Sequence, residues 1–102
     1  MAERLPLQSS ATTLRILTLL MRHFAHGITN KDIAAALSLE PSAVTRHTQL
    51  LIDEGYAERI PETLRLRAGM RLAKGAQEIL QSLDAASLRM VELRTRITTP
   101  TH

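Results

Sequence analysis

Five small or polar side chains between residues 42 and 49 have the chemistry needed to hold or read double-stranded DNA. In a helix they share one face, where Arg46 can offer guanine two donors and Gln49 can pair with adenine. The hydroxyls can bond phosphate or a base, and the alanine methyl can contact thymine. The candidate DNA-binding residues of this face are Ser42, Ala43, Thr45, Arg46 and Gln49.

The opposite face of the same segment is expected to be buried. Val44, Leu51 and Thr48 fall there, so the segment is amphipathic. An ordinary solvent-exposed polar face would also explain the outer side chains. The absence of Asp and Glu from residues 41–52 favours DNA over that alternative.

Three arginines further along the chain are candidates for contacts with the DNA backbone or the minor groove. Residues 64–68 alternate apolar and basic, so a strand there directs Arg65 and Arg67 outward. Arg59 precedes them and has neighbouring glutamates as alternative partners. Solvated strand arginines are common, so an outward direction alone does not establish binding.

Metal binding and catalysis find little support in the sequence. His23 and His26 are three residues apart, but the chain has no Cys and no carboxylate is suitably close to the pair. His47 is expected to pack at the inner edge of its helix or to donate to a phosphate. No Ser-His-Asp arrangement, phosphate loop or pair of catalytic acids stands out. We therefore expect no catalytic residue, no metal and no cofactor.

Length and composition limit the class of protein. The chain has 102 residues and 44% hydrophobic content, enough for one small domain. Phe24 and Tyr56 are the two aromatic residues, which favours a helical core and disfavours readers of single-stranded nucleic acid. The net charge of +3 is mild, with its excess between Arg65 and Arg96.

Membrane attachment and export are not indicated. No apolar run is long enough to span a bilayer, and residues 1–8 do not resemble a signal peptide. Together with the lack of Cys, this predicts a cytoplasmic, nucleoid-associated protein of bacterial or phage type.

A first helix is expected over residues 9–25, ending near Gly27. Ile16 and Leu20 widen its apolar stripe. The stripe itself consists of Leu14, Leu17, Met21 and Phe24, at three- and four-residue steps.

Two further helices follow. Thr29 and Asp32 form a weak capping box that predicts a helix over residues 30–37. A proline in the first turn and a glycine after the end predict another over residues 41–54.

The pattern then changes to period two. Leu64, Leu66 and Ala68 are expected to point inward, and residues 61–63 separate them from a strand over residues 56–60. This predicts a β-hairpin with a tight turn.

Helical spacing returns after Gly69 and continues to Ile97. The apolar residues follow a heptad repeat, which indicates a seam for a partner helix. Its first half could instead pack within the chain, and Gly75 could mark a bend or a later start. Parallel and antiparallel pairing stay open. The candidate dimerisation residues are Leu72, Ala76, Ile79, Leu83, Ala86, Met90, Leu93 and Ile97.

This layout is that of a winged helix-turn-helix: a mainly α fold with three helices and a two-stranded β-hairpin wing, followed here by a long C-terminal helix. The expected organisation is a flexible N-terminus over 1–8, the winged domain over 9–69, a dimerisation helix over 70–97 and a flexible tail over 98–102.

Residues 14–76 resemble the DNA-binding domain of IclR-type transcriptional regulators. The resemblance is carried by Leu51-Ile52-Asp53-Glu54-Gly55-Tyr56-Ala57-Glu58-Arg59 and by Pro61-Glu62-Thr63-Leu64-Arg65-Leu66-Arg67-Ala68-Gly69. Ser42-Ala43-Val44-Thr45-Arg46-His47 is also similar to ArsR- and MarR-type regulators. The resemblance implies operator binding. It departs from the family at Leu64, where such wings usually have glycine, and in lacking the effector-binding domain that normally follows, so no small-molecule effector is predicted.

These observations favour a homodimeric, sequence-specific regulator that binds double-stranded DNA, with residues 41–54 in the major groove and residues 56–68 on the backbone. The alternative is a winged-helix module for protein–protein interaction with a coiled-coil-like oligomerisation helix. An enzyme is disfavoured because the sequence offers no set of converging titratable groups.

Overall fold

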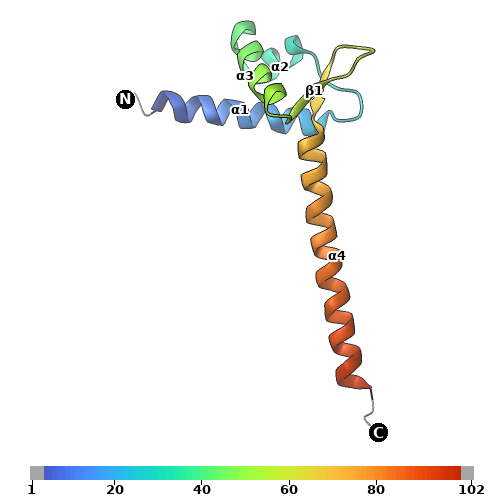
Figure 1. The fold of residues 1–102 in the computed structure, drawn as a ribbon. Helices are drawn as coiled ribbons and strands as arrows, with labels where there is room; N and C mark the ends of the chain where they lie inside the picture. The colour runs from blue at the N-terminus through green and yellow to red at the C-terminus, as the bar shows by residue number, and fades with distance from the viewer. Residues whose placement is uncertain (1–3, 100–102) are drawn as a thin grey trace. The chain divides into compact units, whose positions relative to one another are not determined.

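The computed structural model describes residues 4–99 and divides the chain into two compact units, one up to Leu72 and one from Ala73 onward. Figure 1 shows the order of the elements. These are α1 (Arg4–Arg22), α2 (Asn30–Leu37), α3 (Pro41–Asp53), β1 (Ala57–Arg59), β2 (Leu66–Ala68) and α4 (Met70–Thr98). The fold is therefore mainly helical, a winged helix-turn-helix followed by a long C-terminal helix, as the sequence predicts.

Helix α1 begins earlier than expected. It starts at Arg4 instead of Ser9, so residues 4–8 of the expected N-terminal segment are helical, while residues 1–3 lie outside the described part. Pro6 is compatible with this start because the N–H groups of a first helical turn have no partner within the helix. At its other end, α1 stops at Arg22, before the expected end at residue 25.

The buried edge of α1 also differs from the predicted stripe. Ile16 and Leu20 are fully buried, whereas Leu14, Met21 and Phe24 are exposed. The apolar face of this helix is wider than the surface that covers it. Packing against the rest of the unit buries the edge with Ile16 and Leu20, which the sequence predicts only to widen the stripe.

Helices α2 and α3 form as predicted. The Thr29 Oγ1 atom accepts a hydrogen bond from the backbone N–H of Asp32 at 3.1 Å, which caps α2. Ser38 then turns the chain in the left-handed conformation, with φ of 54°, before Pro41 starts α3. Helix α3 ends at Asp53, one residue before the expected limit.

The hairpin pairs β1 with β2 in antiparallel register, with Glu58 opposite Arg67. A further segment joins this small sheet. The backbone N–H and C=O of Ile28, in the loop between α1 and α2, exchange hydrogen bonds of 2.8 and 2.9 Å with Leu66. The wing is therefore held to the helical part of the unit through the backbone as well as through side chains.

Leu64 is 66% exposed, so the expectation that it points inward is wrong. It lies in the turn, with a φ of 62°, and its N–H donates to the Ile60 carbonyl at 2.7 Å. This left-handed conformation is the one that glycine adopts most easily. The alternation of residues 64–68 therefore applies from Leu66 onward, where β2 begins.

The first unit has one aliphatic core with contributions from all of its helices and from the wing. The clustered side chains are Ile16, Leu20, Ile28, Ile33, Val44, Leu51, Ala57, Leu66 and Ala68.

Helix α4 is continuous through Gly75, so the alternative of a later start is not observed. Leu72 is half-buried and packs against the core of the first unit. No residue of α4 is buried. The helix ends one residue later than expected, and residues 100–102 of the expected tail lie outside the described part.

Candidate nucleic-acid interface

Burial of one face of α3 orients the other face outward. Val44, Thr48 and Leu51 are buried, and the Thr48 hydroxyl donates to the Val44 carbonyl at 2.8 Å, so this polar group is satisfied inside the core. The amphipathic prediction for α3 is confirmed. The candidate residues Ser42, Thr45, Arg46 and Gln49 are exposed, and Ala43 is half-buried.

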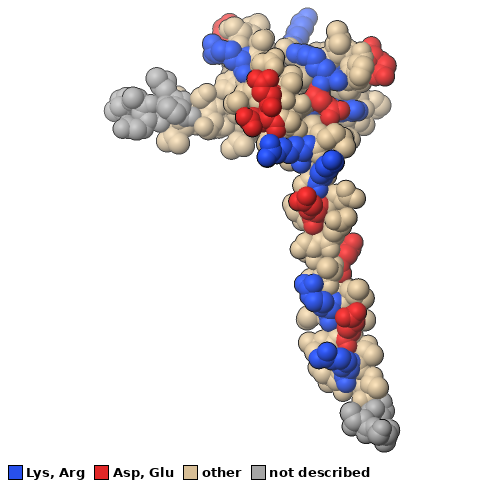
Figure 2. Space-filling model, viewed as in Figure 1, with Lys and Arg blue, Asp and Glu red and all other residues tan. Residues whose placement is uncertain are grey.

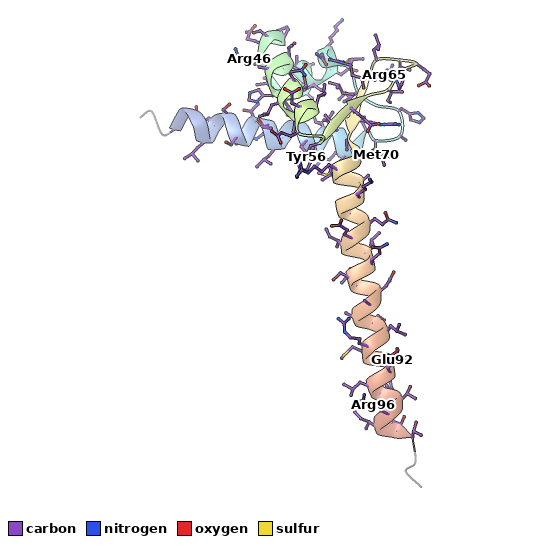
Figure 3. The ribbon with its side chains drawn as sticks, viewed as in Figure 1. Arg46, Tyr56, Arg65, Met70, Glu92 and Arg96 are labelled. Carbon is purple, nitrogen blue, oxygen red and sulfur yellow. The ribbon has the colours of Figure 1, made fainter. Side chains whose placement is uncertain are left out.

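Arg46 and Gln49 differ in what they contact. Within the described residues no hydrogen bond or ion pair involves the Arg46 side chain, which Figure 3 labels on α3. Gln49 Nε2 instead donates to Asp53 Oδ1 at 2.8 Å. Gln49 must break its hydrogen bond with the Asp53 carboxylate before it can bond to a base edge, whereas the donors of Arg46 are available directly.

A hydrogen bond across two helices positions α3. His47 is half-buried, and its Nδ1 lies 2.8 Å from Thr13 Oγ1 of α1. The Thr13 hydroxyl is also within donating distance of the Ser9 carbonyl, at 3.1 Å. Of the two roles considered for His47, the structure places it at the inner edge of its helix.

Arg67 is engaged within the wing. Its Nε and Nη2 atoms donate to Glu58 Oε2 at 3.0 and 2.8 Å, and its guanidinium lies 5.5 Å from the centre of the Phe24 ring. The side chain is 30% exposed. The outward guanidinium expected for Arg67 is thus paired with a carboxylate from the neighbouring strand.

The other two wing arginines are exposed. Arg59 Nη1 donates to the Leu64 carbonyl at 3.1 Å and so supports the hairpin turn. For Arg65, labelled on the hairpin in Figure 3, the described residues offer no side-chain hydrogen bond or ion pair. Among the predicted site arginines, Arg65 and Arg46 are therefore the two whose guanidinium groups make no hydrogen bond or ion pair within the described residues.

Acidic and basic side chains are intermixed on the visible face of the first unit (Figure 2). This face is therefore not uniformly basic, which agrees with the mild net charge of +3. Within residues 4–99, no three His, Cys, Asp or Glu side chains are grouped as a metal site would require. None of the helices described is long and apolar enough to cross a bilayer.

The protein partners of these side chains are not among the features predicted from the sequence. Phe24 and Glu58 hold Arg67, Asp53 holds Gln49, and Thr13 contacts His47. The hairpin register carries a signal for one of them, since pairing 57 with 68 places Glu58 opposite Arg67. The contacts of Phe24 and Thr13 depend on tertiary packing and have no such signal.

Three helices, a two-stranded wing and an outward polar face on the third helix define a winged helix-turn-helix. In agreement, residues 9–58 match the family described as winged helix-turn-helix DNA-binding. A search of curated proteins and a search of solved structures each found no match.

Proposed function

We propose that this chain is a sequence-specific transcriptional regulator that binds double-stranded DNA as a homodimer. Helix α3 enters the major groove, and the wing over residues 56–68 contacts the flanking backbone. The protein acts in the cytoplasm of a bacterium or in phage infection, and within the winged class the IclR-type regulators are its proposed relatives.

The observation that carries this proposal is the exposed outer face of α3, which has no acidic residue between Pro41 and Ile52, on a domain of DNA-binding type. Arg46 reads a guanine, since its side chain makes no bond within the described residues that would have to be broken. Ser42, Ala43 and Thr45 surround it, and Gln49 joins after release from Asp53.

The wing arginines divide into two roles in this proposal. Arg65 contacts phosphate directly. Arg67 and Arg59 mainly order the hairpin through Glu58 and the Leu64 carbonyl, and their remaining donors can contribute to the backbone contact.

Selection of bound sequences from a pool of randomised duplexes at moderate salt tests the proposal, with an enriched motif as the expected result. Arg46→Ala should cost about 1–3 kcal/mol and relax the preference at one base position. Arg15→Ala removes the same charge from an exposed site on α1 and should leave every base preference intact.

The competing function is a protein–protein interaction module. It predicts that the selection enriches no motif. It also predicts that Arg46→Ala and Arg15→Ala weaken the retention of the protein on duplex DNA equally. Either outcome would remove the base-reading role from Arg46. The mild net charge means that base contacts, and not bulk charge, must hold the protein on its site.

A further inference from the structure

The apolar seam of α4 is exposed except at Leu72 and Ala86, which are half-buried. Ile79, Leu83 and Met90 are more than 60% exposed (64%, 62% and 67%), and no residue of α4 is buried. Leu72, the last residue of the first unit, packs against the core of that unit. The apolar surface that α4 leaves uncovered therefore runs from Ala76 to Ile97.

The heptad positions of this surface follow from its spacing. Ala76, Leu83 and Met90 occupy a positions, and Ile79, Ala86 and Leu93 occupy d positions. A hollow on the surface of this helix is lined by Ser87, Met90, Val91, Leu93, Arg94 and Ile97. Four of these residues, at 90, 93, 94 and 97, have the i, i+3, i+4 and i+7 spacing of a hole that receives one side chain of a facing helix.

We propose that α4 pairs with α4 of a second copy in antiparallel orientation, with residue 76 level with residue 93 of the partner. This inference rests on the homodimer proposed above and specifies its geometry. Two independent patterns on the helix, the size of the seam residues and the positions of the arginines, select this arrangement.

Side-chain size gives the first argument. With 76 level with 93, the layers also pair 79 with 90 and 83 with 86. Each alanine then faces a leucine, Ala76 facing Leu93 of the partner subunit and Ala86 facing Leu83 of the partner subunit. In a parallel pair each residue faces its own copy, so Ala76 and Ala86 would form two thin layers that bury little apolar area.

The arginines give the second argument. Arg89 and Arg96 occupy g positions and Arg94 an e position, whereas Glu78, Asp84 and Glu92 lie at b and c positions, away from the seam. A parallel pair brings g and the following e together and sets Arg89 beside Arg94 of the partner subunit, twice in each dimer.

The antiparallel pair removes this repulsion. Each seam arginine then lies beside a small uncharged residue of the other helix. The three neighbours are Ser82 of the partner subunit for Arg89, Ala73 of the partner subunit for Arg94, and Gly75 of the partner subunit for Arg96.

Shifting the antiparallel register by one heptad in either direction gives a less favourable pairing of side chains. One shift places Ala76 against Ala86 of the partner subunit. The other sets Arg89 beside its own copy. Among these arrangements, pairing 76 with 93 alone avoids both an alanine–alanine layer and adjacent arginines.

The orientation determines where the two DNA-binding units are attached. In the antiparallel pair the two Met70 residues are about 43 Å apart along the axis, at 1.5 Å per residue. In a parallel pair they lie side by side, about 10 Å apart. In the antiparallel pair the two DNA-binding units are therefore attached at opposite ends of the paired helices.

Introduced cysteines test the orientation, because the chain has no Cys of its own. Ala76→Cys and Leu93→Cys are prepared separately, in the full chain, and oxidised alone and as a mixture. A disulfide needs its Cα atoms within about 7 Å. We expect the mixture to give a cross-linked 76–93 heterodimer. Neither variant should cross-link with itself, since the two 76 positions lie about 25 Å apart along the axis. Ala85→Cys, on the outer face, is the matched control.

Light scattering on the unmodified protein separates the two proposals. A monomer at micromolar concentration would refute the homodimer itself. A dimer in which Ala76→Cys cross-links with itself would overturn the antiparallel orientation and leave the homodimer standing. A dimer without the 76–93 product would overturn the proposed register.

Discussion

Substitution of Gly69 by alanine should strongly destabilise the first unit. A Cβ atom there would meet the Gly55 carbonyl oxygen and would lie 2.9 Å from the Ala57 backbone nitrogen. Both obstacles are backbone, so no side chain can turn aside. The segment would have to separate, which weakens the hydrogen bonds from Gly69 N–H to the Tyr56 carbonyl, 2.9 Å, and from Arg71 N–H to the Gly55 carbonyl, 3.3 Å.

The two hydrogen bonds are worth about 1 kcal/mol each, and overpacking adds about 1–3 kcal/mol, so we expect a loss of about 3–5 kcal/mol. The midpoint of thermal unfolding should fall by about 10 °C or more. Circular dichroism during heating and urea denaturation measures both quantities.

Gly75→Ala is the matched control, because the same chemical change there meets no atom within 4 Å. Alanine in a helix interior is about 1 kcal/mol more favourable than glycine, so the helical signal should survive to higher temperature. A Gly69→Ala variant as stable as the parent would refute the close approach of Gly69 to residues 55–57. A destabilised Gly75→Ala variant would contradict the continuous α4.

Three smaller perturbations separate stability from DNA binding. Thr29→Ala removes the cap on the Asp32 N–H and should lower the free energy of unfolding by about 1 kcal/mol, measured in urea, with no change in base preference. Arg65→Ala should weaken binding to all duplexes alike and reduce the salt dependence by about one phosphate contact; an unchanged slope counts against its contact. Arg67→Ala should cost up to about 1 kcal/mol of stability, because its pair with Glu58 is partly exposed, and should change the salt slope less than Arg65→Ala.

The sequence predicts the order and type of the elements well because each has a local signal. A capping threonine and a proline mark the starts of α2 and α3, and period two marks the hairpin. The edge of α1 that is buried has no local signal. Ile16 and Leu20 lie on the same broad apolar face as Leu14, and the neighbours that cover them are distant in sequence.

The candidate site is predictable in its residue types but not in its contacts. The periodicity of α3 places Arg46 on the outer face, and the structure agrees. Whether an outward arginine is free to bind DNA depends on the residue opposite it on the paired strand. Arg67 meets Glu58 in the hairpin register, whereas Arg65 has no such partner within the described residues.

The backbone bonds between Ile28 and Leu66 have a consequence for the entropy of DNA binding. Both polar backbone groups of Leu66 are satisfied by Ile28, and its side chain is fully buried, so this amide should exchange with solvent only when the unit opens. A wing anchored in this way is ordered before it meets DNA. The hairpin then loses little conformational freedom when the complex forms. A larger part of the free energy of each contact therefore contributes to the affinity.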